Sequence, residues 1–451
     1  MGRKYFGTDG IRGKANEGNM TPEVAFRLGA AVTYQARKRN RQPRIVIGKD
    51  TRLSSYMIEY ALTAGCAALG GRVWLTGPLP TPAIAHLTQS MRADAGFVIS
   101  ASHNPFYDNG LKIFGPDGFK LPDEQEEELE ALMESDALDK KRPVGRQVGR
   151  AMRIDSAEGR YVQFVKSTFP ADLTLDGMKI VVDAANGAAY KSAPDVFSEL
   201  GATVYPIGVH PNGRNINADR GAVHPESCAK EVKRRHADIG IALDGDADRV
   251  VVVDERGRQV NGDAVMALCA TRMLRNKTLR KRTLVSTVMS GIGLEHAMKE
   301  AGGKLVRAGV GDRYVVESMR QHGYNFGGEQ SGHLVFLDHA TTGDGLLGAL
   351  QTLAIILREQ RPLSELVDEV FQEVPQVLVN VTLPNRLPLS KMPKTRAAIS
   401  DAESALGNGG RVLVRWSGTE PKLRIMVEGP TKGAINKLAR GIAKTAQAEI
   451  S

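Results

Sequence analysis

The stretch ISASHNPFYDNGLKIFG places Ser102 directly after a short apolar run. A serine at the end of a strand presents its hydroxyl at the sheet edge where α/β proteins bind ligands. Pro105 restricts Asn104 to an extended backbone and helps to fix the loop. The GxSxG pattern of hydrolases is absent, and a serine hydroxyl is a weak nucleophile without activation. Ser102 is therefore either a turn residue or a nucleophile that needs help, and Lys112 follows on the same loop.

Three alternating carboxylates, Asp244, Asp246 and Asp248, lie between two apolar runs in IALDGDADRVVVVDE. Carboxylates this close repel one another unless a cation lies among them. An all-oxygen set suits a hard ion such as Mg²⁺ or Ca²⁺. Arg249 stands where an EF-hand loop requires glycine, which excludes that motif. A solvated acidic turn is the alternative, but two flanking strands and the arginine favour a cation site.

The stretch GGEQSGHLVF offers groups suited to a sugar. Its glycines let the backbone approach a ligand closely, and Glu329 and Ser331 can bind hydroxyl or amine groups. His333 could move protons near neutral pH, although a lone histidine beside an apolar strand is more often structural.

The stretch RWSGTEPKLRIMVEG, near the C-terminus, offers groups suited to a phosphate. Ser417, Gly418 and Thr419 form a small-residue turn whose amides and hydroxyls can bind phosphate oxygens. Arg415 and Arg424 can add forked, charge-assisted hydrogen bonds. A plain hairpin turn explains this stretch equally well. Together, the four stretches fit phosphoryl transfer on a phosphorylated sugar better than hydride or acyl chemistry.

The composition is that of a globular protein, with 451 residues, 42% hydrophobic and 25% charged. No stretch approaches the ~18 apolar residues of a membrane span, and the start lacks an apolar signal core. We therefore expect a cytoplasmic protein with no membrane partner. The net charge of +9 suits an enzyme for anionic substrates. The basic clusters are short, scattered and free of aromatics, so we expect no nucleic-acid partner. Three widely spaced cysteines predict buried, reduced thiols.

Helical and strand patterns alternate along most of the chain, which predicts α/β layering. A helix over 21–38 precedes a strand at 44–48, and the rhythm restarts with strands at 179–183 and 284–288. The last ~75 residues differ, because they follow a β-α-β-β-α order. They predict a small α+β domain that begins just after Pro375.

Five ordered motifs, FGTDGIRG, ASHNP, DGDADR, GEQSGH and RWSGTEP, make the chain resemble the alpha-D-phosphohexomutase family over nearly its whole length. Within that family, VGDRYV, TTGDGLLGALQ and Gln330 resemble the bacterial branch that acts on glucosamine phosphates. The resemblance implies three related α/β domains with mixed sheets and a smaller C-terminal α+β domain, around a central cleft. The implied domains span residues 1–153, 154–256, 257–370 and 371–451.

The resemblance also implies a reaction, which is interconversion of glucosamine 6-phosphate and glucosamine 1-phosphate for UDP-N-acetylglucosamine synthesis. It implies a phosphoserine at Ser102, glucosamine 1,6-bisphosphate as activator and intermediate, and a homodimer. One Mg²⁺ per chain is implied, held by the seryl phosphate and the three aspartates. From the charge of such a site we expect Lys112 or His333 to accept the proton of the attacking hydroxyl, with Lys112 favoured for its place after Ser102, and Arg249 to orient or neutralise groups near the metal. The implied substrate-binding residues are Arg12, Glu329, Ser331, Arg415, Ser417, Gly418, Thr419 and Arg424.

Two alternatives stay open. One is a phosphomannomutase/phosphoglucomutase with a broader choice of sugar. The other, from a different class, is a noncatalytic protein that binds phosphosugars or nucleic acid.

Overall fold

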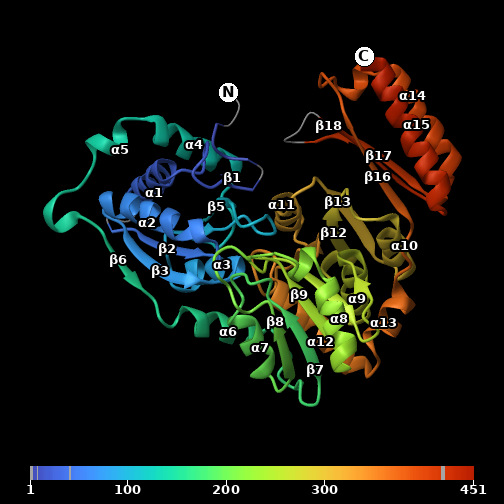
Figure 1. The fold of residues 1–451 in the computed structure, drawn as a ribbon, viewed down its shortest axis with the longest axis horizontal. Coiled ribbons are helices and arrows are strands. Elements are labelled where there is room, and N and C mark those ends of the chain that lie inside the picture. Colours follow the sequence, from blue (N-terminus) through green and yellow to red (C-terminus); the bar gives the residue numbers. More distant parts are fainter. Residues whose placement is uncertain (1–3, 8, 40–41, 418–421, 451) are drawn as a thin grey trace. The chain divides into compact units, whose positions relative to one another are not determined.

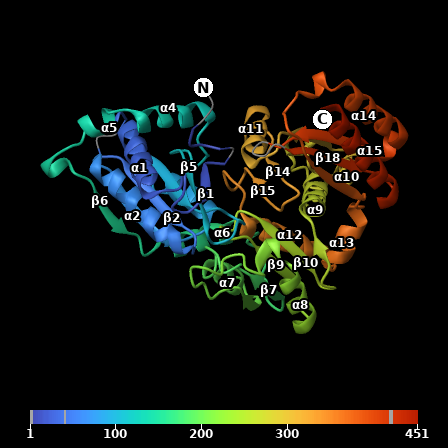
Figure 2. The ribbon, with the colours of Figure 1, turned by 45° about the horizontal axis from the view of Figure 1, so that its top comes forward.

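The computed structural model describes residues 4–7, 9–39, 42–417 and 422–450. The chain divides into two compact units. Unit 1 comprises Met1–Met289 and Gly303–Val370, and unit 2 comprises Ser290–Gly302 and Phe371–Ser451. Unit 1 contains three mixed sheets with helices, and unit 2 contains one small antiparallel sheet (Figures 1 and 2). The predicted fold class, three α/β domains and a smaller α+β domain, is confirmed.

The first sheet has the strand order β1-β5-β4-β2-β3-β6. Its strands are β1 (Ile11–Lys14), β2 (Arg44–Lys49), β3 (Arg72–Pro78), β4 (Ala95–Ile99), β5 (Asp108–Phe114) and β6 (Arg150–Arg153). Strand β5 runs antiparallel to β1 and β4, whereas β2, β3, β4 and β6 are parallel. Strand β4 is buried along its whole length, which explains its unbroken apolar sequence. Ser102 follows the carboxyl end of this strand.

Five helices accompany the first sheet: α1 (Pro22–Arg37), α2 (Leu53–Ala68), α3 (Thr81–Ser90), α4 (Asp123–Glu134) and α5 (Ala137–Lys140). The side chain of Thr21 caps α1 by accepting from the N–H of Val24. Figure 1 shows α1 and α2 side by side, and α3 packs on β2 and β4. One hydrophobic cluster contains fully buried side chains from both layers: Leu28 of α1, Leu62 of α2 and Phe97 of β4. Burial of these side chains fixes the sheet that carries the segment 100–108 around Ser102, which we call the serine loop.

The second sheet has the order β11-β10-β9-β7-β8. Its strands are β7 (Lys179–Asp183), β8 (Thr203–Ile207), β9 (Ile239–Leu243), β10 (Val250–Asp254) and β11 (Gln259–Val260), with helices α6 (Ala157–Ser167), α7 (Ser192–Ser198) and α8 (Glu226–Arg235). Residues 244–249, which include the three aspartates and are called the aspartate loop, join β9 to the antiparallel β10. Since β11 pairs with β10, this sheet extends past residue 256. The four domain boundaries stay a prediction.

The third sheet has the order β13-β12-β14-β15. It comprises β12 (Thr283–Thr287), β13 (Lys304–Ala308), β14 (Phe326–Gly328) and β15 (Leu334–Phe336), with α9 (Gly262–Arg275), α11 (Asp312–His322), α12 (Gly345–Glu359) and α13 (Leu363–Val370). The loop that carries Glu329 joins the antiparallel strands β14 and β15.

Unit 2 has the antiparallel strand order β16-β18-β17. Its elements are α10 (Ile292–Glu300), β16 (Gln376–Thr382), α14 (Pro393–Leu406), β17 (Arg411–Trp416), β18 (Lys422–Glu428) and α15 (Lys432–Ile450). Helices α14 and α15 lie side by side in both views (Figures 1 and 2). The predicted β-α-β-β-α order is therefore present, and α10 joins it from an earlier part of the chain.

Two further predictions concern the whole chain. Among the described helices, none combines the length and the hydropathy that a membrane span requires. The three cysteines, Cys66, Cys228 and Cys269, are free and buried, as predicted.

Candidate active site

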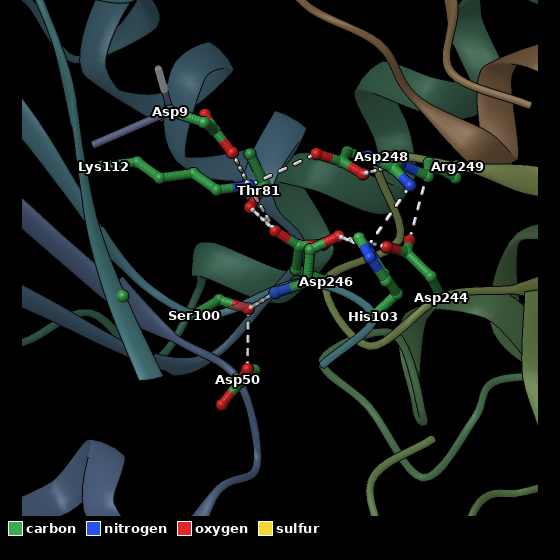
Figure 3. A network of polar contacts seen from close by, with 12 residues as sticks. Asp9, Asp50, Thr81, Ser100, His103, Lys112, Asp244, Asp246, Asp248 and Arg249 are labelled. Carbon is green, nitrogen blue, oxygen red and sulfur yellow. Dashed lines mark hydrogen bonds and ion pairs between the residues drawn. The ribbon is translucent and has the colours of Figure 1, made fainter. Parts of the chain in front are cut away.

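The serine loop holds Ser102 in a left-handed backbone conformation, with φ of +51°. Such a conformation costs a residue with a Cβ about 1–3 kcal/mol, so surrounding contacts must impose it. The N–H of Ser102 donates to Ser100 Oγ at 3.0 Å, and Ser100 Oγ donates to Asp50 Oδ2 at 2.6 Å (Figure 3). Ser102 is only 1% exposed. These contacts hold the backbone of Ser102 in place.

Arg52, which the sequence reasoning missed, supports this loop from inside. Its side chain is fully buried and its Nε lies 2.7 Å from Asp50 Oδ2. Its guanidinium donates to four backbone carbonyls of the serine loop, those of Ser102, Asn104, Pro105 and Asp108. The available signal was the polar run that follows β2, because parallel β2 and β4 end at the same sheet edge.

The aspartate loop brings three carboxylates together against Ser102. Asp244, Asp246 and Asp248 are buried, and one oxygen from each lies within 4.8 Å of the others. Ser102 Oγ donates to Asp244 Oδ2 at 2.5 Å. Gly245 makes this approach feasible, since a Cβ there would lie 2.6 Å from the Ser102 carbonyl oxygen. The structure therefore places the predicted serine and the predicted cation site side by side.

The electrostatics of this cluster favour a cation. Burial, together with repulsion from Asp248 and Asp246, raises the pKa of Asp244 well above its usual range. Asp246 Oδ1 and Asp248 Oδ1 are buried acceptors with no hydrogen-bond partner among the described residues. Buried acceptors without partners are costly, and an oxygen-preferring divalent ion would satisfy them. The residues present therefore fit Mg²⁺.

Lys112 reaches this cluster from β5 as a buried cation (Figure 3). Its Nζ lies 2.8 Å from Asp246 Oδ2, 3.3 Å from Asp248 Oδ2 and 3.7 Å from Asp9 Oδ2. Burial lowers the pKa of Lys112, but attraction to Asp246, Asp9 and Asp248 outweighs it and the net shift is upward. In this arrangement Lys112 is a charged donor. Acting as a proton acceptor would first require its carboxylate contacts to be replaced.

Asp9, another residue the sequence reasoning missed, links three cations around the site. It binds Arg12, lies near Lys112 and accepts from Lys120 Nζ at 2.6 Å. Lys120 also donates to Asp312 Oδ2 at 2.5 Å. The network joins the predicted Arg12 to the aspartate cluster through a carboxylate. Asp9 lies within the FGTDGIRG motif, which was the signal for it.

His333 lies buried between two carboxylates. Its Nδ1 is 3.8 Å from Asp248 Oδ1, and its Nε2 is 3.5 Å from Asp312 Oδ2. Burial lowers the pKa of His333, whereas Asp248 and Asp312 raise it, with a net upward shift. The N–H of Gly343 donates to Nε2 at 3.2 Å, a contact that needs the neutral ring. The neighbours of Nε2 therefore favour opposite protonation states.

Arg249 and His103 cover the other side of Asp244 (Figure 3). The backbone N–H of Arg249 donates to Asp244 Oδ1 at 3.2 Å, and its Nη1 lies 3.3 Å from His103 Nδ1. Burial and the charge of Arg249 lower the pKa of His103 to about 4. His103 is therefore a neutral ring beside Ser102, with Nδ1 3.5 Å from Oγ.

The loop between β14 and β15 presents Glu329 and Ser331 as a pair. Ser331 Oγ donates to Glu329 Oε2 at 3.3 Å, and the Gly311 N–H donates to Oε1 at 3.2 Å. The next two residues, Asp312 and Arg313, begin α11 and bind groups near α4. The start of α11 thus connects the predicted sugar-binding loop to the first sheet.

The buried anchor of α11 is Arg313. It pairs with Asp123 and donates to Glu126 Oε1 at 2.6 Å. The acidic run at 123–136 predicts a solvated helix whose buried face carries Leu129, Leu132 and Met133, and α4 is present. However, Glu126 is buried, because it neutralises this arginine.

In unit 2, two predicted phosphate-binding arginines face each other. Arg415 on β17 and Arg424 on β18 are directly opposite in the ladder. Arg424 Nη2 lies 3.4 Å from Ser417 Oγ, and Arg386 donates to the Ser417 carbonyl at 2.7 Å. Burial and the charge of Arg424 lower the pKa of Arg415. The arrangement concentrates positive charge at Ser417. Gly418 and Thr419 lie outside the described residues.

Family models match the chain in four successive segments. Phosphoglucomutase/phosphomannomutase alpha/beta/alpha domains I, II and III match residues 3–140, 159–257 and 261–374, and the C-terminal domain matches 378–445. A curated phosphoglucosamine mutase from Sorangium cellulosum is 62% identical over 451 residues, covering 100% of this chain and 94% of that protein.

Two solved structures share the fold. A phosphoglucomutase/phosphomannomutase family protein from Burkholderia thailandensis has a TM-score of 0.82 and 25% identity, over 99% of this chain and 97% of that one. The N-acetylphosphoglucosamine mutase of Aspergillus fumigatus, in complex with GlcNAc-6P and magnesium, has a TM-score of 0.71 and 17% identity. That match covers 99% of this chain and 96% of the other.

Proposed function

This chain belongs to the phosphoglucomutase/phosphomannomutase family, and on that premise we propose that it interconverts glucosamine 6-phosphate and glucosamine 1-phosphate. The choice of sugar is supported by the Sorangium cellulosum phosphoglucosamine mutase, which is 62% identical over the full chain. The observation that carries the chemistry is the 2.5 Å contact of Ser102 Oγ with Asp244 inside a buried aspartate cluster.

Ser102 is proposed to carry a phosphoryl group between the two ends of the sugar. The phosphoserine P–O bond breaks as a P–O bond forms to the free sugar hydroxyl, whose proton passes to a base. The product is glucosamine 1,6-bisphosphate, which then returns its other phosphoryl group to Ser102 Oγ. Both half-reactions conserve phosphate, so one phosphorylated enzyme serves many turnovers.

Charge balance explains why this site needs its cations. A phosphoserine carries about −1.5 to −2, and three aspartates add a further −3 if all are ionised. One Mg²⁺ held by Asp244, Asp246, Asp248 and the seryl phosphate would neutralise two units and polarise the phosphoryl oxygens. Lys112 and Arg249 are placed to offset part of the rest. Fixed charges of this kind stabilise charge that develops during transfer.

His333 and Lys112 are proposed to be the proton acceptors, and each would serve one of the two half-reactions. His333 has the better position for the neutral form, because Gly343 donates to its Nε2. Lys112 is held as an ammonium by Asp246 and Asp248, so it acts first as a neutralising group.

Recognition of the substrate is proposed to involve β1 and two loops. Glu329 and Ser331 are proposed to bind the amine and hydroxyl groups of the sugar, and Arg12 to bind phosphate oxygens. Arg415, Ser417, Gly418, Thr419 and Arg424 are proposed to bind the phosphate that is not reacting. A homodimer and a cytoplasmic location stay predictions.

Two measurements test the phosphate carrier and the choice of sugar. Mass spectrometry should show about 80 Da of added phosphate on a peptide that contains Ser102. The phosphorylated protein should have a higher kcat/KM for glucosamine 1-phosphate than for glucose 1-phosphate. Phosphorylation with a preference for glucose or mannose phosphates would support the broader phosphomannomutase/phosphoglucomutase. A protein that never carries phosphate on Ser102 and turns over neither sugar would contradict both.

A further inference from the structure

We propose that Asn217 is a positioning residue that holds the carrier Ser102 against the aspartate loop; this inference rests on the proposed function. Asn217 lies in the segment between β8 and α8, far from Ser102 in the sequence. Its Nδ2 donates to the Ser102 carbonyl at 2.9 Å and to the Asn104 carbonyl at 3.1 Å. The segment between β8 and α8 is thus hydrogen-bonded directly to the serine loop.

A residue that follows β2 of the first sheet donates a matching pair of hydrogen bonds. Arg52 Nη2 donates to the same two carbonyls, at 2.9 Å each. Each carbonyl therefore accepts two hydrogen bonds, one from Arg52 and one from Asn217. Since Ser102 has φ of +51°, these four bonds oppose relaxation of its backbone.

The position of Asn217 is itself fixed. Its backbone has φ of +59°, and its N–H donates to the Ala185 carbonyl at 2.9 Å. Gly245 lies against both partners, because a Cβ there would be 2.6 Å from the Ser102 carbonyl oxygen and 2.9 Å from Asn217 Nδ2. The amide is thus wedged between the serine loop and the loop that carries Asp244.

The chemistry of this contact requires an amide. Two carbonyls converge on one nitrogen, so that atom must be the NH₂ group with its two hydrogens. Asn217 Oδ1 is buried without a hydrogen-bond partner among the described residues. Only the donor half of the side chain is used, and an aspartate of the same shape would present an oxygen to two carbonyl oxygens.

Three variants test the proposal. Asn217→Asp keeps the shape and reverses the polarity, whereas Asn217→Ala removes the donor without adding a charge. Asn215→Asp is the matched control, because that amide lies in the same segment and donates to His210 and not to the serine loop. The measurements are the single-turnover rate of phosphoryl transfer from phosphorylated enzyme to glucosamine 1-phosphate, the KM and the Tm.

We expect Asn217→Asp to lower the single-turnover rate about 100-fold and Asn217→Ala about 10-fold, with little change in KM, because misplacing a reacting group by about 1 Å costs about this much. Asn215→Asp should keep the rate of the parent. An Asn217→Ala protein that transfers phosphate at the parent's rate would overturn this inference and leave the proposed function standing. This holds even if Asn217→Asp does not fold. A loss in the single-turnover rate that only follows the unfolded fraction would also overturn the inference. A parent protein that transfers no phosphate would overturn the proposed function as well.

Discussion

The aspartate cluster of unit 1 and the arginine hairpin of unit 2 have opposite electrostatic needs. In the cluster, burial together with repulsion from Asp248 and Asp246 raises the pKa of Asp244, whereas on the hairpin burial together with the charge of Arg424 lowers the pKa of Arg415. In both regions burial is the first cause of the shift, and a nearby group of like charge adds to it. We therefore expect a ligand of the opposite sign to stabilise each region, a divalent cation for the first and, as proposed above, a phosphate for the second.

The largest expected effect comes from the group that the cation site serves. Ser102→Ala removes the proposed phosphate carrier, so we expect kcat/KM for glucosamine 1-phosphate to fall at least about 1,000-fold. Ser102 Oγ donates to Asp244, and loss of that bond leaves the aspartates to repel one another as before. The Mg²⁺-induced rise in Tm should therefore persist in the unphosphorylated protein.

Ser198→Ala is the control for this change, because Ser198 is exposed on α7 and its hydroxyl donates to the Asp195 carbonyl of the same helix. It should keep the activity of the parent. An active Ser102→Ala protein would refute the carrier role and leave the aspartate cluster without its catalytic partner.

Within unit 1, the residues of the candidate site differ in how far the sequence predicted them. The three aspartates and Ser102 belong to local motifs, and the strand ends that bring them together follow from α/β layering. Arg52 lies in the polar run that follows β2 and Asn217 in the segment between β8 and α8, and neither belongs to a motif that predicts its partners. Their contacts depend on how one sheet's loops meet another's, which no periodicity encodes.

The same limit applies to charged residues that are buried on folding. The acidic run at 123–136 predicts a solvated helix, and a helix is present over Asp123–Glu134. Glu126 is nevertheless buried, because Arg313 of a distant helix neutralises it. Local composition predicts the element, whereas the partner of a buried charge is set by tertiary contacts.

The second prediction concerns the cation site itself. Asp244→Asn removes one charge from a repelling set, so we expect about a 100-fold loss of kcat/KM and loss of most of the Mg²⁺-induced rise in Tm. Without metal, the variant should be more stable than the parent at neutral pH. The folded-state pKa of Asp244 is raised, so the metal-free parent should gain stability as the pH falls through that pKa. Thermal unfolding with and without Mg²⁺ between pH 5 and 8 measures this.

Asp155→Asn is the control for that variant, since Asp155 is 93% exposed. It should respond to Mg²⁺ and to pH as the parent does. A metal-free Asp244→Asn protein that is less stable than the parent would show that repulsion does not dominate this cluster.

The smallest expected effect lies on the hairpin. Arg415→Met removes one of two opposed cations, and a lost charge-assisted hydrogen bond to phosphate should raise KM for glucosamine 1-phosphate about 10-fold, with a smaller change in kcat. The Mg²⁺-induced rise in Tm should stay that of the parent, because Arg415 belongs to unit 2 and the aspartates to unit 1. Arg440→Met, at an exposed position of α15, should change neither quantity. Steady-state kinetics and thermal unfolding separate these outcomes. An unchanged KM in Arg415→Met, or a loss of its Mg²⁺ response, would mean that the two regions do not divide cation and anion binding between them.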